Sequence, residues 1–240
     1  MAGIRNIKQF KNTIMKKIIH ALTIIDKSGS MMSFRSRTIE GINSNIATLK
    51  KEVDENTEIL NTTLQFSSIG NNWHSLSNDK ELNFVFTRIG CPVGSVEDIT
   101  EKDYSPAGGT PLLDAIGLGI EKIKEFHGDK LRDDNISVIV TIITDGEENS
   151  STLYNRSEIK KMIEHFEADG KWTFTFIGCG SFENVSNTSA QLGINCSNTI
   201  AYDASEEGTC QAFACASTSY LNYSRSVKSG VVDKALFTQK

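Results

Sequence analysis

Two patterns of apolar residues alternate along the chain: continuous apolar runs, and apolar residues spaced three or four apart. Their alternation predicts strands that alternate with helices. Continuous apolar or β-branched runs predict strands over residues 18–26, 58–66, 135–144, 172–178 and 199–202. Apolar residues spaced three or four apart predict helices over residues 39–49, 112–126, 157–169, 185–192 and 206–220. Such an order is typical of βα units, in which the strands are mostly parallel.

We therefore expect an α/β protein with a Rossmann-like, doubly wound central sheet and helices on both faces. The sheet is expected to be mostly parallel, with one antiparallel edge hairpin. The hairpin is indicated by the turn signal Gly70-Asn71-Asn72, which follows the strand predicted at 58–66. Residues 84–86 are either its second, short strand or part of an insertion. Residues 90–107 are expected to form a loop with a short helical piece.

The chain of 240 residues shows no internal repeat and no linker, so we expect a single domain. This domain is predicted to span residues 17–222. A polar, basic N-terminal arm over residues 1–16 and a C-terminal tail over residues 223–240 are expected to flank it.

Composition excludes several classes of protein. The net charge of -5 and the pI near 5.5 argue against a nucleic-acid-binding protein, which usually carries a basic surplus. No apolar stretch is long enough to span a bilayer, and no secretory signal pattern follows the basic N-terminus. The five cysteines are an odd number without a Cys-x-x-Cys pair, which favours free thiols in a reducing compartment. We expect a cytoplasmic protein without a membrane or nucleic-acid partner.

Three polar segments carry the candidate chemistry. Asp26, Ser28 and Ser30 directly follow the first predicted strand, and their hard oxygens suit Mg²⁺, Mn²⁺ or Ca²⁺. Thr144-Asp145-Gly146 ends the most apolar strand, and Gly108-Gly109-Thr110-Pro111 precedes a predicted helix. In doubly wound sheets ligands gather at the carboxyl ends of strands. Each segment alone is better explained as a cap or turn, but the three together indicate a site.

Together these motifs resemble the von Willebrand factor type A (VWA) domain with a metal-ion-dependent adhesion site (MIDAS). The family pattern Asp-x-Ser-x-Ser, a distant Thr and a distant Asp is matched by Asp26, Ser28, Ser30, Thr110 and Asp145. The surrounding residues are similar to those of bacterial and phage intracellular members, such as the tellurium-resistance-like stress-response type. The resemblance covers roughly residues 17–222.

The resemblance implies a role for each of the five residues. Ser28, Ser30 and Thr110 would offer hydroxyl oxygens to Mg²⁺, with Mn²⁺ or Ca²⁺ as alternatives. Asp26 and Asp145 would act mostly through bound water and neutralise charge. The ion would then accept an Asp or Glu side chain from a partner protein, so the family implies a protein-binding module and not an enzyme.

A haloacid-dehalogenase-type phosphatase or phosphotransferase, with Asp26 as nucleophile, is the alternative. That chemistry needs a second carboxylate two residues later as acid or base, and Ser28 occupies this position. A purely structural domain that has lost its metal is a further alternative.

Other residues are expected to have ordinary structural roles. Thr110 is expected to cap the following helix, with Pro111 at the first helical position. Glu147 and Glu148 are expected to be solvated turn residues. The four histidines show no metal-binding spacing and are expected at the surface or in packing.

Overall fold

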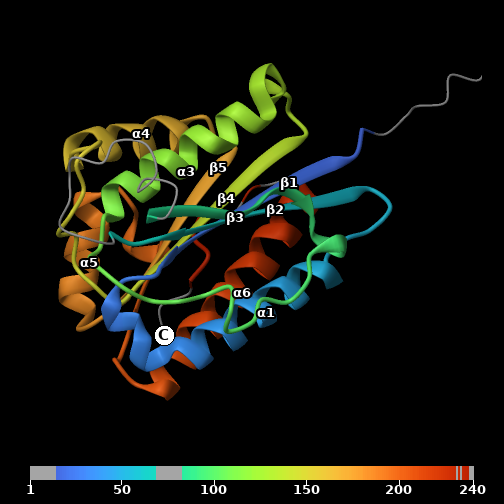
Figure 1. Ribbon diagram of the computed structural model, residues 1–240. Coiled ribbons are helices and arrows are strands. Elements are labelled where there is room, and N and C mark those ends of the chain that lie inside the picture. Colours follow the sequence, from blue (N-terminus) through green and yellow to red (C-terminus); the bar gives the residue numbers. More distant parts are fainter. Residues whose placement is uncertain (1–14, 69–82, 231, 233, 238–240) are drawn as a thin grey trace, which may run out of the picture.

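The computed structural model describes residues 15–68, 83–230, 232 and 234–237, and the following account concerns these residues. Its main elements are β1 (Lys17–Asp26), α1 (Arg35–Lys51), β2 (Thr57–Phe66), β3 (Phe84–Pro92), α3 (Leu112–His127), β4 (Ile136–Thr144), α4 (Arg156–Ala168), β5 (Trp172–Cys179), α5 (Phe182–Gln191), β6 (Thr199–Tyr202) and α6 (Glu206–Ser229) (Figure 1). Short 3-10 helices lie at Gly29–Phe34, Val93–Ser95, Gly128–Arg132 and Cys196–Asn198.

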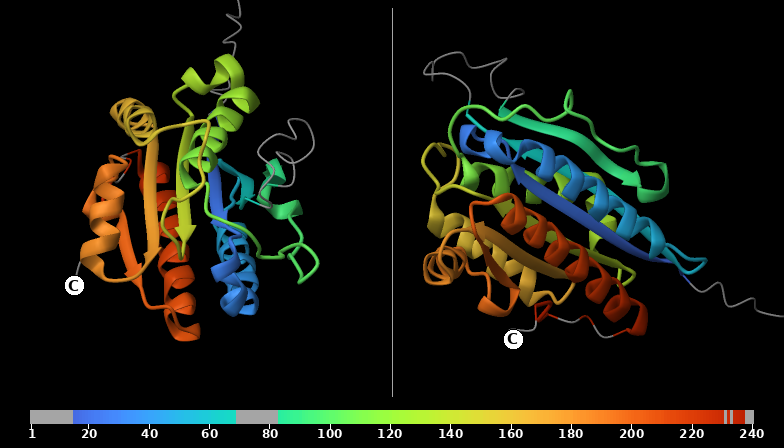
Figure 2. Two further views of the ribbon diagram at one scale, coloured as in Figure 1. Left: turned by 60° about the vertical axis from the view of Figure 1, so that its left-hand side comes forward. Right: turned by 90° about the horizontal axis from the view of Figure 1, so that it is seen from below.

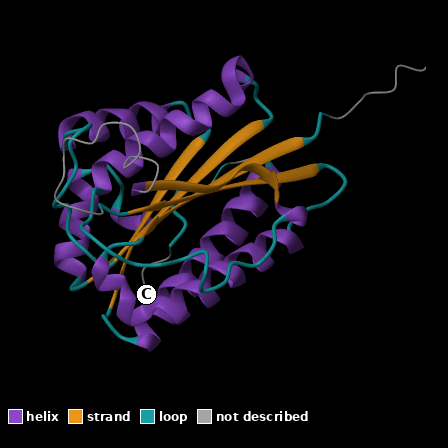
Figure 3. Cartoon of the chain, viewed as in Figure 1, coloured by secondary structure: helices purple, strands orange, loops and turns teal. Residues whose placement is uncertain are grey.

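The strands form one sheet in the order β3-β2-β1-β4-β5-β6. Every neighbouring pair is parallel except β2 with β3, which is antiparallel (Figure 3). β3 is thus the antiparallel strand at one edge of the sheet. The predicted fold class is therefore confirmed. β4 is buried along its whole length, as its continuous apolar sequence indicated.

Helices cover both faces of this sheet. α1 and α6 lie side by side on one face, and α3, α4 and α5 cover the other (Figure 2). The buried side chains divide accordingly into two clusters, one on each face. Gly41 permits the close packing of α1 on α6, because a Cβ atom there would lie 2.1 Å from the Phe213 ring.

The pairing of β1 with β4 creates the topological switch point of the sheet. The chain builds outward from β1 to β2 and β3, and then returns to the other side of β1 with β4. Ile25 pairs with Ile143, so the carboxyl ends of the two strands lie next to each other. Ligands of doubly wound folds bind in the crevice above such a point.

Three elements are clearly longer than predicted, namely α1, which spans Arg35–Lys51, β3 and α6. β3 extends to Pro92 and contains bulges where it pairs with β2, and bulges obscure the alternation by which a strand is recognised. α6 continues to Ser229 and so includes the first residues of the expected tail; Tyr223 and Val227 prolong its buried face. The predicted turn at residues 70–72 and most of the N-terminal arm lie outside the described residues.

A pair of buried histidines lies toward the other end of β1. His20 Nδ1 is 2.8 Å from His127 Nε2, and His20 Nε2 is 2.7 Å from Thr62 Oγ1. The backbone N–H of Gly90 donates to Thr62 Oγ1. These three contacts are mutually consistent if Thr62 donates to His20 and His20 Nδ1 donates to His127. This arrangement requires neutral rings, and burial lowers the pKa of His20 to about 3.

The neutral histidine pair predicts an acid-sensitive fold. Because the folded pKa of His20 lies below its usual value of 6.5, the unfolded chain binds the additional proton more readily as the pH falls through that value. His20 alone should lower the free energy of unfolding by about 2 kcal/mol between pH 7 and pH 5. Urea denaturation of wild type and His20→Gln at both values measures this contribution.

The control is His165→Gln, which removes an exposed histidine on α4. In His165→Gln the free energy of unfolding should change with pH as it does in the wild type. In His20→Gln the decrease between pH 7 and pH 5 should be smaller by the contribution of His20. An equal response of wild type and His20→Gln to acid would contradict the prediction.

Candidate metal centre

The structure brings the five predicted site residues together at the ends of β1 and β4. Ser28 Oγ lies 3.1 Å from Ser30 Oγ, and Ser30 Oγ donates to Asp145 Oδ1 at 2.8 Å. The backbone N–H of Ser28 donates to Asp26 Oδ1 at 2.7 Å. One chain of contacts therefore runs from the end of β1 to the residue that follows β4.

Thr110 reaches the same place from the loop before α3. The backbone N–H of Gly29 donates to the carbonyl of Gly108, which holds this loop against the turn after β1. A Cβ atom added to Gly146 would lie 3.1 Å from Thr110 Oγ1 and 3.9 Å from Asp26 Oδ2. Gly146 thus leaves the space between these two oxygens free of side-chain carbon.

Asp26 is the most buried charged group of the site. It is fully buried, and it accepts hydrogen bonds from Thr144 Oγ1 at 2.6 Å and from the backbone of Ser28. It forms no ion pair with any described residue. Burial raises the pKa of Asp26 to about 6, although both hydrogen bonds oppose the shift. Burial also raises the pKa of Asp145.

The donor set suits a hard cation and not a soft one. It consists of two carboxylates and three hydroxyls, all oxygen ligands of the kind that Mg²⁺ and Mn²⁺ prefer. No group of three or more His, Cys, Asp or Glu side chains with metal-site geometry occurs among the described residues. A cation here would therefore depend on the hydroxyls, and it would offset the desolvated charge of Asp26.

The expectation that Thr110 caps the next helix is wrong. α3 begins at Leu112 with Pro111 in the capping position, and no local side chain caps it. The cap comes instead from the loop after β4: Glu148 accepts from the backbone N–H of Leu113 at 2.9 Å. The Thr110 hydroxyl is therefore available to the site.

Glu148 is also not the solvated turn residue that we expected. Its carboxylate accepts from the backbone of Ser150 and Ser151 and from the Ser151 hydroxyl, in addition to Leu113. Four charge-assisted hydrogen bonds of this kind hold the loop after β4 against the start of α3.

Asp114 and Asn149 complete this clamp, and neither is identifiable from the sequence pattern. Buried Asp114 accepts three backbone N–H groups from residues 152–154, at 2.8–2.9 Å. Asn149 accepts from the backbone N–H of Thr110 and donates its own N–H to the Thr110 carbonyl. The partners are 35–40 residues apart in the chain, so no local motif reveals them.

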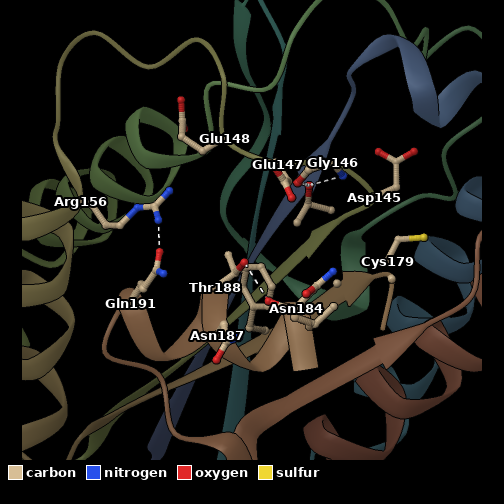
Figure 4. A pocket seen from close by; sticks show the side chains of 15 residues that line it. Asp145, Gly146, Glu147, Glu148, Arg156, Cys179, Asn184, Asn187, Thr188 and Gln191 are labelled. Carbon is tan, nitrogen blue, oxygen red and sulfur yellow. Dashed lines mark hydrogen bonds between the residues drawn. The ribbon is translucent and has the colours of Figure 1, made fainter. Parts of the chain in front are cut away.

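A pocket of about 380 Å³ borders the site on the side of β5. Asp145 and Gly146 line it together with residues of α5 and the start of α4 (Figure 4). Its walls carry mostly polar side chains.

Known structures with the same arrangement identify the fold. The vWF domain of the type V pili tip protein Mfa5 from Porphyromonas gingivalis is 8% identical, with a TM-score of 0.55 over 91% of this chain and 98% of that chain. The chain has the von Willebrand factor type A fold. The pilus adhesin SpaC from Lactobacillus rhamnosus GG is also similar in structure, at 10% identity and a TM-score of 0.60, over 86% of this chain.

Proximal thread matrix protein 1 from the mussel byssus is also similar, at 10% identity and a TM-score of 0.52 over 84% of this chain. This VWA chain spans only 30% of the adhesin and 46% of the matrix protein. No protein-family model matches the sequence, and no curated protein matches it significantly. Among the described helices of this VWA fold, none is long and apolar enough to cross a membrane.

The clamp around Asp114 predicts a local change in stability. In Asp114→Asn an amide NH₂ group replaces one acceptor oxygen, so one or two of the three hydrogen bonds from residues 152–154 are lost, at a cost of about 2 kcal/mol. Hydrogen exchange of these amides should accelerate accordingly. Asp129→Asn, which makes the same charge change at an exposed position, should leave their exchange unaltered. Unchanged exchange in Asp114→Asn would show that the clamp does not hold the loop.

Proposed function

We propose that this protein is a divalent-metal-dependent protein-binding module. Its MIDAS would hold Mg²⁺, with Mn²⁺ or Ca²⁺ as alternatives, and the ion would accept an acidic side chain from a partner protein. The observation that carries the proposal is the convergence of Asp26, Ser28, Ser30, Thr110 and Asp145 at one switch point of a VWA fold. The motif resemblance and the donor chemistry support it.

The proposed roles follow from position and burial. Ser28, Ser30 and Thr110 would supply neutral oxygens to the ion. Asp26 and Asp145 would balance its charge, either directly or through water. Because only two carboxylates contribute, the ion would keep much of its positive charge and its affinity for a further anionic ligand. The chemistry that the ion supplies is binding of a carboxylate.

We further propose that the protein is not an enzyme. In the phosphatase alternative, Asp26 would have to attack a phosphoryl group, but it is fully buried and hydrogen-bonded to Thr144. The position of the required acid or base is occupied by Ser28. We assign the module to the cytoplasm, and its five free cysteines support a reducing compartment. A stress-response role of the tellurium-resistance-like type rests on the motif resemblance alone.

Metal binding is the first prediction of this proposal. Calorimetric titration of the wild type with Mg²⁺ or Mn²⁺ should reveal one site, and Asp145→Asn should weaken it at least about tenfold because a balancing charge is lost. The control Asp129→Asn should bind like wild type. The absence of binding heat in the wild type, or equal affinity in Asp145→Asn, would contradict the proposal.

Two glycine variants test whether metal binding needs the open space beside Thr110. Gly146→Ala introduces a methyl group beside Thr110 Oγ1, whereas a Cβ atom at Gly94 meets no atom within 4 Å. Gly146→Ala should therefore weaken metal binding while Gly94→Ala leaves it unchanged. Both variants should remain folded by circular dichroism.

A pull-down and a hydrolysis assay distinguish the proposed binding function from the phosphatase alternative. A pull-down with tagged protein in Mg²⁺ should retain a protein that EDTA releases and that Asp145→Asn fails to retain. The same preparation should not hydrolyse p-nitrophenyl phosphate. Steady hydrolysis that is lost in Asp26→Asn would instead support the phosphatase alternative.

A further inference from the structure

The pocket beside the candidate metal centre is continuous with it. Asp145 and Gly146 line both, and Thr144 of β4 with Phe176 and Gly178 of β5 also line the pocket. Figure 4 shows Asp145 at one end of this pocket and Arg156 with Gln191 at the other. A ligand bound to a metal at Asp145 could therefore extend into the pocket without leaving the surface.

One face of α5 forms a polar wall of the pocket. Asn184, Asn187, Thr188 and Gln191 recur every three or four residues and all line it. Amide side chains both donate and accept hydrogen bonds, so they suit the backbone of an extended peptide better than an apolar group.

Arg156 is the only Lys or Arg among the described residues that line the pocket. It is exposed at the start of α4, and its guanidinium donates to Gln191 Oε1 of α5. In the described part of the chain it forms no ion pair, whereas Arg35 and Arg37 both do. The guanidinium is thus oriented by Gln191 and has no ion-pair partner among the described residues.

Asp145, Glu147 and Glu148 also line the pocket, but in the described part of the chain no ion pair joins any of them to Arg156. Glu148 is engaged by backbone N–H groups of its own loop and of α3, and Asp145 accepts from Ser30 in the metal centre. An oriented guanidinium with free N–H groups binds a carboxylate well, because its donors match the two oxygens.

We infer that the partner segment carries two carboxylates, one for the metal ion and a second for Arg156, with the intervening backbone along the α5 wall. The first contact rests on the proposed function; the second is a separate subsite built by Arg156 and Gln191. The subsite selects diacidic segments of one spacing over segments with a single acidic residue. Its contribution is that of an exposed ion pair, about fivefold in Kd.

Synthetic peptides test the inference. The probes are acetylated, amidated alanine peptides that carry two Glu residues with spacers of increasing length, and matched peptides with one Glu replaced by Gln. Titration into ¹⁵N-labelled protein with saturating Mg²⁺, followed by NMR, gives the Kd values. One spacer should bind about fivefold tighter than its single-Glu match and should shift the side-chain signals of Arg156 and Gln191.

Variants test whether the tighter binding of the diacidic peptide depends on the Arg156 subsite. Arg156→Gln should abolish it without changing Mg²⁺ binding or the Kd of the single-Glu peptide. Lys161→Gln makes the same charge change at an exposed position of α4 outside the pocket and should retain it.

The outcomes separate the two proposals. If single-Glu peptides bind with Mg²⁺ but no diacidic peptide binds tighter, or if Arg156→Gln keeps the advantage, the subsite is wrong and the proposed function stands. Diacidic binding that needs Arg156 but not Mg²⁺ would support the subsite and overturn the proposed function. Failure of every peptide to bind would overturn both.

Discussion

β1 and β4 pair in parallel at the centre of the sheet, although the two strands are separated by more than a hundred residues. The register of this pair places Asp26 beside Thr144, whose hydroxyl donates to the buried carboxylate. Because side chains alternate between the faces of a strand, a slip of one residue would turn Asp26 away from Thr144. The candidate metal centre thus depends on the backbone hydrogen bonds that pair β1 with β4.

Burial of Asp26 gives the site its chemical character. A desolvated carboxylate costs free energy, and two hydrogen bonds offset only part of this cost, as its raised pKa shows. The phenol of Tyr104, itself buried, donates to the Asp26 carbonyl at 2.6 Å and so fixes the strand end. Positive charge is what such a site lacks, and the divalent cation that we propose would supply it.

The loop after β4 is also fixed by hydrogen bonds to buried or half-buried carboxylates. Glu148 and Asp114 together accept seven hydrogen bonds from this loop and the start of α3. A loop that is ordered before binding loses less conformational entropy when a partner arrives. The same clamp fixes Thr110 on one side and the rim of the α5 pocket on the other, so the metal centre and the pocket share one rigid edge.

The sequence by itself determined the alternation of strands and helices, and with it the doubly wound sheet, because apolar periodicity is a local property. Through its resemblance to the VWA motif, the sequence also singled out Asp26, Ser28, Ser30, Thr110 and Asp145 as one candidate set, which the fold brings together. Tertiary structure alone decided that Glu148, and not Thr110, caps α3, and that Asp114, Asn149 and Thr144 support the site. It alone also placed Arg156 opposite α5. These contacts join residues far apart in the chain, and their partners are selected by packing and register, which no local pattern records.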